Sequence, residues 1–452
     1  MFVLIALMCM SGVYLLMVRV GKTVPGAQMG LENPLFVPIL WVLFQMTDFI
    51  YLYYDNSPSL RGVYFTGENR DIVYGLLVFT LAIIALLSGI GYGLSVFSKN
   101  SKEIVNRAIF TRDAAKIALP FSLTIVSLNI FLFIQLIVSN SENFSEISAL
   151  KAKTASDFPI LSVLTWMSVL SVGYLVSTST RSKTVLLAYL IPAMALSWGT
   201  GSRIHLIILA IFALQAFRRR NVSIPVGWAP IIAPLAIIFL TLLRSVRAGS
   251  GGITNFFYDR GGVLPSLYGS DEVATAETIT FGLKNLSQAF MYRWPGEGIA
   301  GLLITYLPRE YIQWKPFPAS SQFTQWLSPG IWEASRSQFT IGGVMEACME
   351  FGVVGALLYL FVIGFGFAYL LCRAARSPSL QAFFYASLSI FLFLVLRTDM
   401  QTSGVFVLPL ILTVSAIALL RQTTRKTRRA RIHPGRFQAA NPQYLPNGAR
   451  QR

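Results

Sequence analysis

The stretch "WGTGSRIHL" (198–206) has residues that could bind an anion. The glycines allow the backbone to approach a ligand, and Ser202 can cap the helix that follows. Free N–H groups at a helix start attract phosphate, and Arg203 adds a planar cation that grips phosphate in two places. We interpret Ser202 and Arg203 as a phosphate cradle. The alternative is an arginine that only anchors the end of a membrane helix.

His205 lies two residues further on, so it points about 200° around the helix from Arg203. The two side chains therefore cannot address the same ligand atom. His205 is either a proton carrier or a packed, hydrogen-bonded side chain, and the sequence leaves both interpretations open.

The elements that hold these residues are predicted by composition. Hydrophobic residues make up 54% of the 452 residues and charged residues 13%, which is typical of a polytopic membrane protein. The apolar residues form long runs, so we expect an all-α fold rather than a barrel. The net charge of +17 does not indicate nucleic acid, because the basic residues gather in short loops beside apolar runs. The three cysteines have no metal-ligand spacing.

About eleven transmembrane helices are expected. Their approximate ranges are 1–18, 34–54, 72–97, 117–139, 159–180, 184–198, 203–217, 227–243, 341–372, 379–396 and 404–420. Basic residues in the short loops favour an N-terminus outside and a C-terminus inside. The span 341–372 is long enough to begin outside the bilayer or to tilt. The sequence thus divides into helices 1–8 (1–243), an outer loop (244–340), helices 9–11 (341–420) and a basic, disordered tail (421–452).

The outer loop 244–340 is too long to be a simple connection. Ile279, Leu283, Leu286 and Phe290 have the spacing of an amphipathic helix. The segment "GIAGLLITYLP" (298–308) is apolar but too short to span, so we expect it to lie in the interface or to dip into it. Tryptophans and basic residues follow, and their chemistry suits headgroups, sugars or anions.

Several motifs resemble one family. These are the "GSR" that opens a helix before a long outer loop, "LPREYIQWKPFP", "GGVMEACMEFGVVGALLYLFVIGFGF" and "LRTDMQ". In this order they resemble segments of the bacterial O-antigen polymerases, the oligosaccharide repeat unit polymerases of Wzy type. Glu346 matches the family's glutamate, whereas Glu350 stands where a neutral polar residue is usual. The resemblance covers about the second half of the chain.

This resemblance implies a GT-C-like glycosyltransferase in the bacterial inner membrane, with its active site facing the periplasm. Undecaprenyl-diphosphate-linked oligosaccharides would be both donor and acceptor, surrounded by membrane lipid. A chain-length regulator protein would be a further partner. No metal cluster is visible in the sequence, so we expect metal-independent chemistry without a cofactor. The charge distribution gives no reason to expect nucleic acid as a partner. The product would be O-antigen, capsule or exopolysaccharide.

The resemblance also suggests roles for individual residues. The leaving diphosphate needs fixed cations, and the outside candidates are Arg203 with Ser202, Arg244, Arg247, Arg309, Lys315, Arg336 and Arg397. The acceptor hydroxyl needs a general base. Glu346 is the first candidate, followed by Asp399 and His205. Asp399 could equally form a structural pair with Arg397.

Three alternatives remain. An O-antigen ligase, which passes glycan to lipid A core, would share the loop and the arginines. A flippase or transporter of lipid-linked oligosaccharides would show paired halves, and no internal repeat is visible. Asp48, within the second span, would suit a proton-coupled transporter or a buried carboxyl with a polar partner. A non-catalytic anion-binding membrane protein needs only a basic outer pocket.

Overall fold

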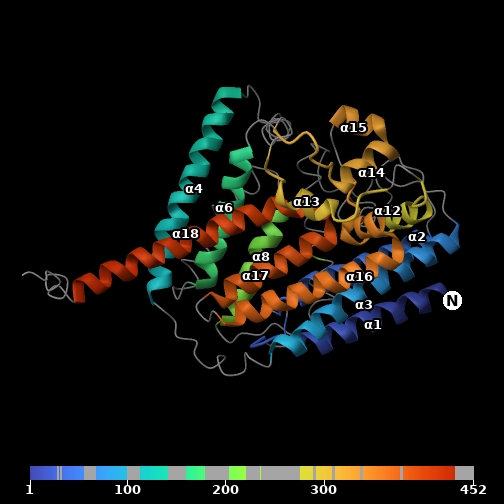
Figure 1. Ribbon diagram of the computed structural model, residues 1–452, viewed down its shortest axis with the longest axis horizontal. Helices are drawn as coiled ribbons and strands as arrows, with labels where there is room; N and C mark the ends of the chain where they lie inside the picture. The colour runs from blue at the N-terminus through green and yellow to red at the C-terminus, as the bar shows by residue number, and fades with distance from the viewer. Residues whose placement is uncertain are drawn as a thin grey trace, which may run out of the picture.

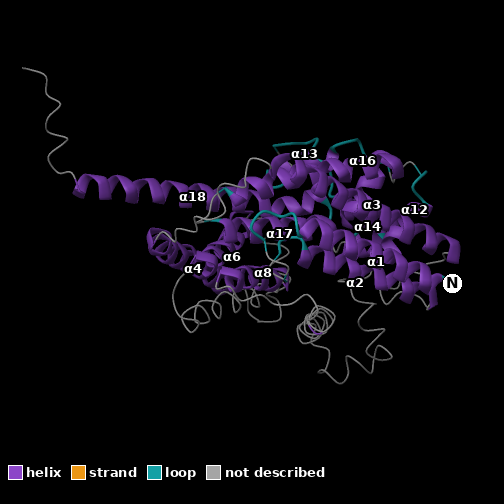
Figure 2. Ribbon diagram, turned by 90° about the horizontal axis from the view of Figure 1, so that it is seen from below, coloured by secondary structure: helices purple, strands orange, loops and turns teal. Residues whose placement is uncertain are grey.

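The computed structural model describes residues 1–27, 30, 33–54, 68–98, 112–140, 159–178, 203–219, 235, 275–288, 292–307, 311–335, 339–376 and 380–432. This part of the chain is helical and contains no β-strand (Figure 2). Its helices are α1 (Phe2–Gly21), α2 (Phe36–Tyr54), α3 (Asn69–Phe97), α4 (Arg112–Asn140), α6 (Pro159–Thr178), α8 (Arg203–Arg219), α12 (Thr275–Lys284), α13 (Glu297–Leu303), α14 (Ala319–Leu327), α15 (Pro329–Ser335), α16 (Gly342–Ala375), α17 (Gln381–Arg397) and α18 (Met400–Ile432).

The all-α membrane character expected from the sequence fits these helices. Nine of the eleven expected spans coincide with a described helix, while 184–198 and all of 227–243 except Leu235 lie outside the described residues. Within the described residues, five helices are long and apolar enough to cross a bilayer: α1, α2, α3, α16 and the Met400–Leu420 part of α18. The total of eleven spans and their orientation stay predictions.

One group of helices is built around α3 and α16. Together with α1 and α2 they run alongside one another (Figure 1) and share one cluster of buried apolar side chains. Glycines bring α3 and α16 together: a Cβ at Gly89 would overlap the carbonyl of Phe361, and one at Gly364 would overlap that of Leu86. Small residues permit such close helix contacts in membranes.

A second group consists of α4, α6, α8, α17 and α18, which share another apolar cluster. In Figure 1, α4, α6 and α8 stand at an angle to the first group. The C-terminal part of α18 extends away from the molecule (Figures 1 and 2). We expected the last span to end at 420 and a disordered tail to follow. The helix instead continues to Ile432, and 433–452 lie outside the described residues.

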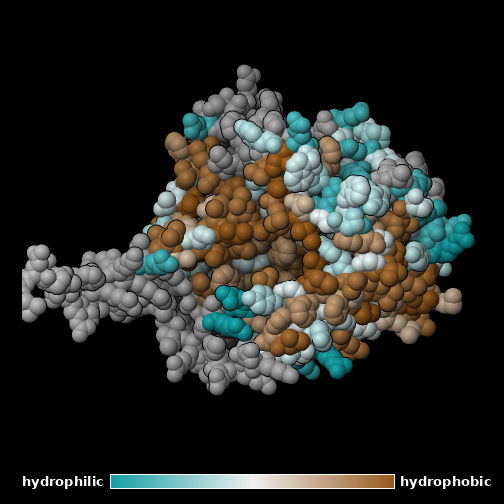
Figure 3. All heavy atoms as spheres, in the orientation of Figure 1, coloured by the Kyte–Doolittle hydropathy of each residue, from teal (hydrophilic) through white to brown (hydrophobic). Residues whose placement is uncertain are grey.

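The segment expected to be an outer loop carries the short helices α12 to α15. Atoms over α14 and α15 are largely hydrophilic, whereas apolar atoms cover the face over α6 and α18 (Figure 3). The predicted amphipathic helix coincides in part with α12, where Ile279 and Leu283 are buried. The helix ends at Lys284, before Leu286, and Phe290 lies outside the described residues. Asp48 of α2 fixes its start by accepting a 2.9 Å hydrogen bond from the backbone N–H of Ala276. This contact supports the interpretation of Asp48 as a buried carboxyl with a polar partner.

The helix α16 is interrupted near its start. Gly352 has a φ of 67° and a ψ of 174°, a backbone conformation that only glycine adopts readily. The interruption follows a buried segment, 342–350, and separates it from the apolar remainder of the helix. The buried segment carries both glutamates of the "MEACME" motif.

Candidate functional site

The strongest concentration of charge in the described residues surrounds Arg293, which precedes α13. Its guanidinium has no exposed surface. Nη2 lies 3.9 Å from a carboxylate oxygen of Glu297 and 3.9 Å from Oε1 of Glu346, and Nε lies 3.7 Å from Oε1 of Glu350. Burying a charge is costly unless it is paired, so these three carboxylates account for a fully buried arginine.

Arg293 also joins segments that are distant in the sequence. Its backbone N–H donates to the carbonyl of Met349 in α16 at 3.2 Å. Its Nη1 donates to the carbonyl of Phe317 at 2.9 Å and to Oε1 of Gln322 in α14 at 3.0 Å. One side chain therefore holds together the segment before α13, the start of α14 and the start of α16.

Glu350 positions α13. Its Oε2 accepts a 2.9 Å hydrogen bond from the backbone N–H of Gly296, and its Oε1 accepts one of 2.6 Å from that of Gly298. Gly296 has a φ of 84°, which allows the chain to turn sharply into the helix. A Cβ at Gly298 would lie 2.5 Å from Oε1 of Glu346, so only glycine lets α13 approach the two glutamates this closely.

Glu346, the first candidate base, lies under α13 and is 4% exposed. Its Oε2 accepts a short hydrogen bond from the backbone N–H of Met400, at the start of α18. Its Oε1 has no hydrogen-bond partner among the described residues. One oxygen is thus fixed by the protein, and the other is directed into the buried cluster.

Asp399, the second candidate, directly precedes Met400 and is fully buried. Its Oδ1 accepts a 2.7 Å hydrogen bond from the N–H of Thr402, so Asp399 caps the start of α18. Its Oδ2 accepts a 3.2 Å hydrogen bond from the N–H of Ser320. The sequence offered a structural pair of Asp399 with Arg397 as an alternative. Arg397 is not among the described residues that bind the Asp399 carboxylate. The carboxyl groups of Asp399 and Glu346 are close enough to repel each other.

His205, the third candidate, lies in a different part of the protein. It is buried in α8, and its ring packs edge-on against Trp166 of α6 with 4.7 Å between ring centroids. Trp166 belongs to the second apolar cluster, whereas the side chains next to Glu346 belong to the first. The described contacts therefore favour a packed histidine.

Lys315, predicted to bind diphosphate, donates hydrogen bonds to two backbone carbonyls, and its role in binding diphosphate stays a prediction. Its Nζ donates to the carbonyls of Thr305 at 2.6 Å and of Leu307 at 2.8 Å, just after α13. The hydroxyl of Tyr306 donates to the carbonyl of Val405 in α18. Burial raises the pKa of Tyr306 above its ordinary value, so the hydroxyl remains a donor.

The other predicted cations are described incompletely or not at all. Arg203 is the first residue of α8, as expected, but its side chain lies outside the described residues. Arg397 ends α17 and is partly buried. Outside the described residues lie Ser202, Arg244, Arg247, Arg309 and Arg336. The phosphate cradle stays a prediction.

Sequence reasoning missed three members of the cluster: Arg293, Glu297 and Gln401. Gln401 donates from Nε2 to the carbonyl of Pro316 at 3.1 Å, and its Oε1 has no hydrogen-bond partner among the described residues. The stretch "YRWPGEG" did contain a signal, since an arginine and a glutamate four residues apart enclose a Pro-Gly turn. Nothing local connects that turn to the glutamates some fifty residues later.

Exposed aromatic side chains flank the buried cluster. Tyr292 and Trp294 lie on either side of Arg293, and their rings pack edge to face at 5.9 Å. Tyr311, Trp314 and Phe317 precede α14 and are also exposed. Such rings suit a membrane interface or the apolar face of a sugar.

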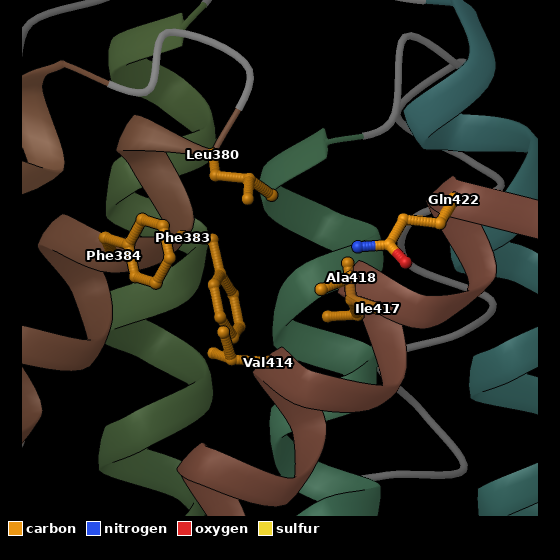
Figure 4. A pocket seen from close by; sticks show the side chains of 7 residues that line it. All are labelled: Leu380, Phe383, Phe384, Val414, Ile417, Ala418 and Gln422. Carbon is orange, nitrogen blue, oxygen red and sulfur yellow. The ribbon is translucent and has the colours of Figure 1, made fainter. Parts of the chain in front are cut away.

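A pocket of about 230 Å³ lies between α17 and α18 (Figure 4). None of its lining residues is ionisable; they are Leu380, Phe383, Phe384, Val414, Ile417, Ala418 and Gln422. Val414 is about 20 Å along α18 from Met400. The pocket is therefore separate from the carboxylate cluster and has no group for acid–base chemistry.

Comparison of the chain with protein-family models, with curated proteins and with solved structures gave no match.

Proposed function

We propose that the chain is a GT-C-like glycosyltransferase of the bacterial inner membrane, which joins oligosaccharide repeat units carried on undecaprenyl diphosphate at the periplasmic face. The observation that carries the proposal is the environment of Glu346. Its Oε2 is fixed by the N–H of Met400, its Oε1 has no hydrogen-bond partner among the described residues, and the guanidinium of Arg293 lies 3.9 Å from it. A carboxylate held in this way suits a general base.

The proposed reaction is a single displacement. Oε1 of Glu346 takes the proton of an acceptor hydroxyl, and the acceptor oxygen forms a new glycosidic bond to the anomeric carbon of the donor. The bond between that carbon and the diphosphate breaks, and its electron pair leaves with the diphosphate. Arg293 limits the cost of placing Glu346 near other carboxylates before it accepts the proton.

The donor diphosphate needs cations that Arg293 cannot supply, because its guanidinium already faces three carboxylates. Arg203, at the start of α8, is the first candidate for this task. Replacing Arg203 with alanine should weaken binding of undecaprenyl diphosphate by the purified protein. Unchanged affinity would remove the phosphate cradle from the proposal.

The test of the reaction is the surface glycan of a deletion strain, separated by size on a gel. Wild-type protein should restore the ladder of long chains, whereas Glu346→Gln should leave a single repeat unit on the final acceptor. Glu333→Gln is a matched control, because Glu333 is an exposed carboxylate on α15. A normal ladder with Glu346→Gln would exclude Glu346 as the base.

The same gel separates the alternatives. In a ligase deletion, long chains persist on the lipid carrier and never reach lipid A. In a flippase deletion, unpolymerised units are trapped on the inner leaflet. Either pattern would contradict the proposed polymerase.

A further inference from the structure

Four buried polar atoms under α13 have no hydrogen-bond partner among the described residues. They are Nε and Nη2 of Arg293, Oε1 of Glu346 and Oε1 of Gln401. Folded proteins leave few buried polar groups unpaired, and a group of them calls for an explanation. Two donors and two acceptors together suggest a ligand that completes their hydrogen bonds.

The two acceptors lie against the same face of α13. A Cβ at Gly298 would be 2.5 Å from Oε1 of Glu346, and one at Gly301 would be 2.5 Å from Oε1 of Gln401. Residues three apart on a helix are neighbours on one face. Nη2 of Arg293 lies 3.9 Å from Oε1 of Glu346, which is longer than a direct hydrogen bond. Both groups therefore keep bonding capacity for a third partner.

On the basis of the proposed function, we propose that Arg293, Glu346 and Gln401 form the subsite for the acceptor sugar, and that α13 covers this subsite. A hydroxyl group accepts one hydrogen bond while it donates another. One sugar hydroxyl can thus accept from the guanidinium of Arg293 and donate to Oε1 of Glu346. A neighbouring hydroxyl can donate to Oε1 of Gln401.

The charge of the cluster selects against an anionic ligand. Around the guanidinium of Arg293 stand the carboxylates of Glu297, Glu346 and Glu350, all within 4 Å. A diphosphate placed here would meet three like charges and one opposite charge, and like charges in contact disfavour binding. The subsite therefore takes an uncharged, hydroxylated ring, and the diphosphate binds elsewhere.

Access to the subsite requires α13 to move, because Arg293 is 1% and Glu346 4% exposed. The helix has seven residues and follows Gly296, whose left-handed backbone permits a hinge. Polar contacts hold it at both ends: Glu350 binds the N–H of Gly298, and Oγ1 of Thr305 donates to the carbonyl of Gln401 at 3.0 Å. These bonds can exchange with water when the helix lifts.

The test compares two probes on the purified protein in nanodiscs. One is the repeat-unit oligosaccharide released by mild acid from the polysaccharide of the source cell, and the other is undecaprenyl diphosphate. Gln401→Leu should bind the oligosaccharide about tenfold more weakly or worse, with unchanged affinity for undecaprenyl diphosphate. Gln401→Glu keeps the acceptor oxygen but not the donor to Pro316, so it should retain oligosaccharide affinity.

Equal losses in both variants would assign Gln401 a structural role only, and unchanged oligosaccharide binding by Gln401→Leu would also overturn the subsite. If Gln401→Leu does not fold, hydrogen exchange of the wild-type protein tests the subsite instead. The oligosaccharide, but not undecaprenyl diphosphate, should then slow exchange in residues 296–303, and no change would reject the proposal. A deletion strain that keeps its ladder would reject the polymerase without deciding whether the sugar binds.

Discussion

Oε1 of Glu350 accepts a 2.6 Å hydrogen bond from the backbone N–H of Gly298, although the two residues are 52 positions apart. The same oxygen lies 3.7 Å from Nε of Arg293. The place of α13 and the charge balance of the buried arginine therefore depend on one carboxylate. Glu350 thus has a structural role that follows from its contacts with Gly298 and Arg293.

Replacing Glu350 with alanine should loosen α13 and leave Arg293 with fewer partners. Breaking a buried ion pair typically destabilises a protein by about 3–5 kcal/mol, so we expect a clear fall in melting temperature. Hydrogen exchange at 296–303 should quicken. Glu350→Gln keeps one acceptor oxygen and should lie between wild type and alanine. Equal melting temperatures for all three proteins would contradict the role of Glu350.

Gly298→Ala should disturb the cluster through shape alone. The added Cβ would meet Oε1 of Glu346 at 2.5 Å and Oε1 of Glu350 at 2.9 Å. Overpacking of this kind costs about 1–3 kcal/mol, and we expect loss of the glycan ladder as α13 moves off Glu346. Gly330→Ala is the matched control, because a Cβ at this exposed glycine of α15 meets nothing within 4 Å. A ladder of wild-type length with Gly298→Ala would show that the close approach is dispensable.

Lys315→Ala tests a residue to which the sequence assigned a different role. Because its Nζ donates to the carbonyls of Thr305 and Leu307, its loss should lower the free energy of unfolding by about 1 kcal/mol. Affinity for undecaprenyl diphosphate, measured in nanodiscs, should stay at the wild-type value. A large loss of that affinity with unchanged stability would instead support the predicted role in diphosphate binding.

Much of the helical architecture could be predicted because apolar runs and their lengths encode it directly. The end of α18 at Ile432 could not be predicted. The basic sequence after 420 is typical of a cytoplasmic membrane anchor, and such an anchor can be helical or disordered. For α16, the sequence predicted only a span longer than the bilayer requires. It did not predict the interruption at Gly352. A single glycine does not reveal its own backbone angles.

The candidate site was predicted in part. Glu346 and Asp399 were found through motifs, and the hydrogen bond from Met400 to Glu346 brings the two motifs together. Arg293 and Gln401 were missed because their importance arises from tertiary contacts across more than fifty residues. The two backbone contacts of Lys315 could not be predicted, since a lysine that caps carbonyls and one that binds phosphate look alike in a sequence.

Asp48 provides a test that separates an enzyme from a proton-coupled transporter. Its carboxylate caps α12 through the N–H of Ala276, a task that a side-chain amide oxygen also performs. Asp48→Asn should therefore retain both stability and the glycan ladder, whereas Asp48→Ala should lose about 1 kcal/mol of stability through the missing cap. A transporter that moves protons through Asp48 would fail with asparagine as completely as with alanine, because neither side chain titrates. Loss of function with Asp48→Asn at wild-type melting temperature would favour the transporter over the glycosyltransferase.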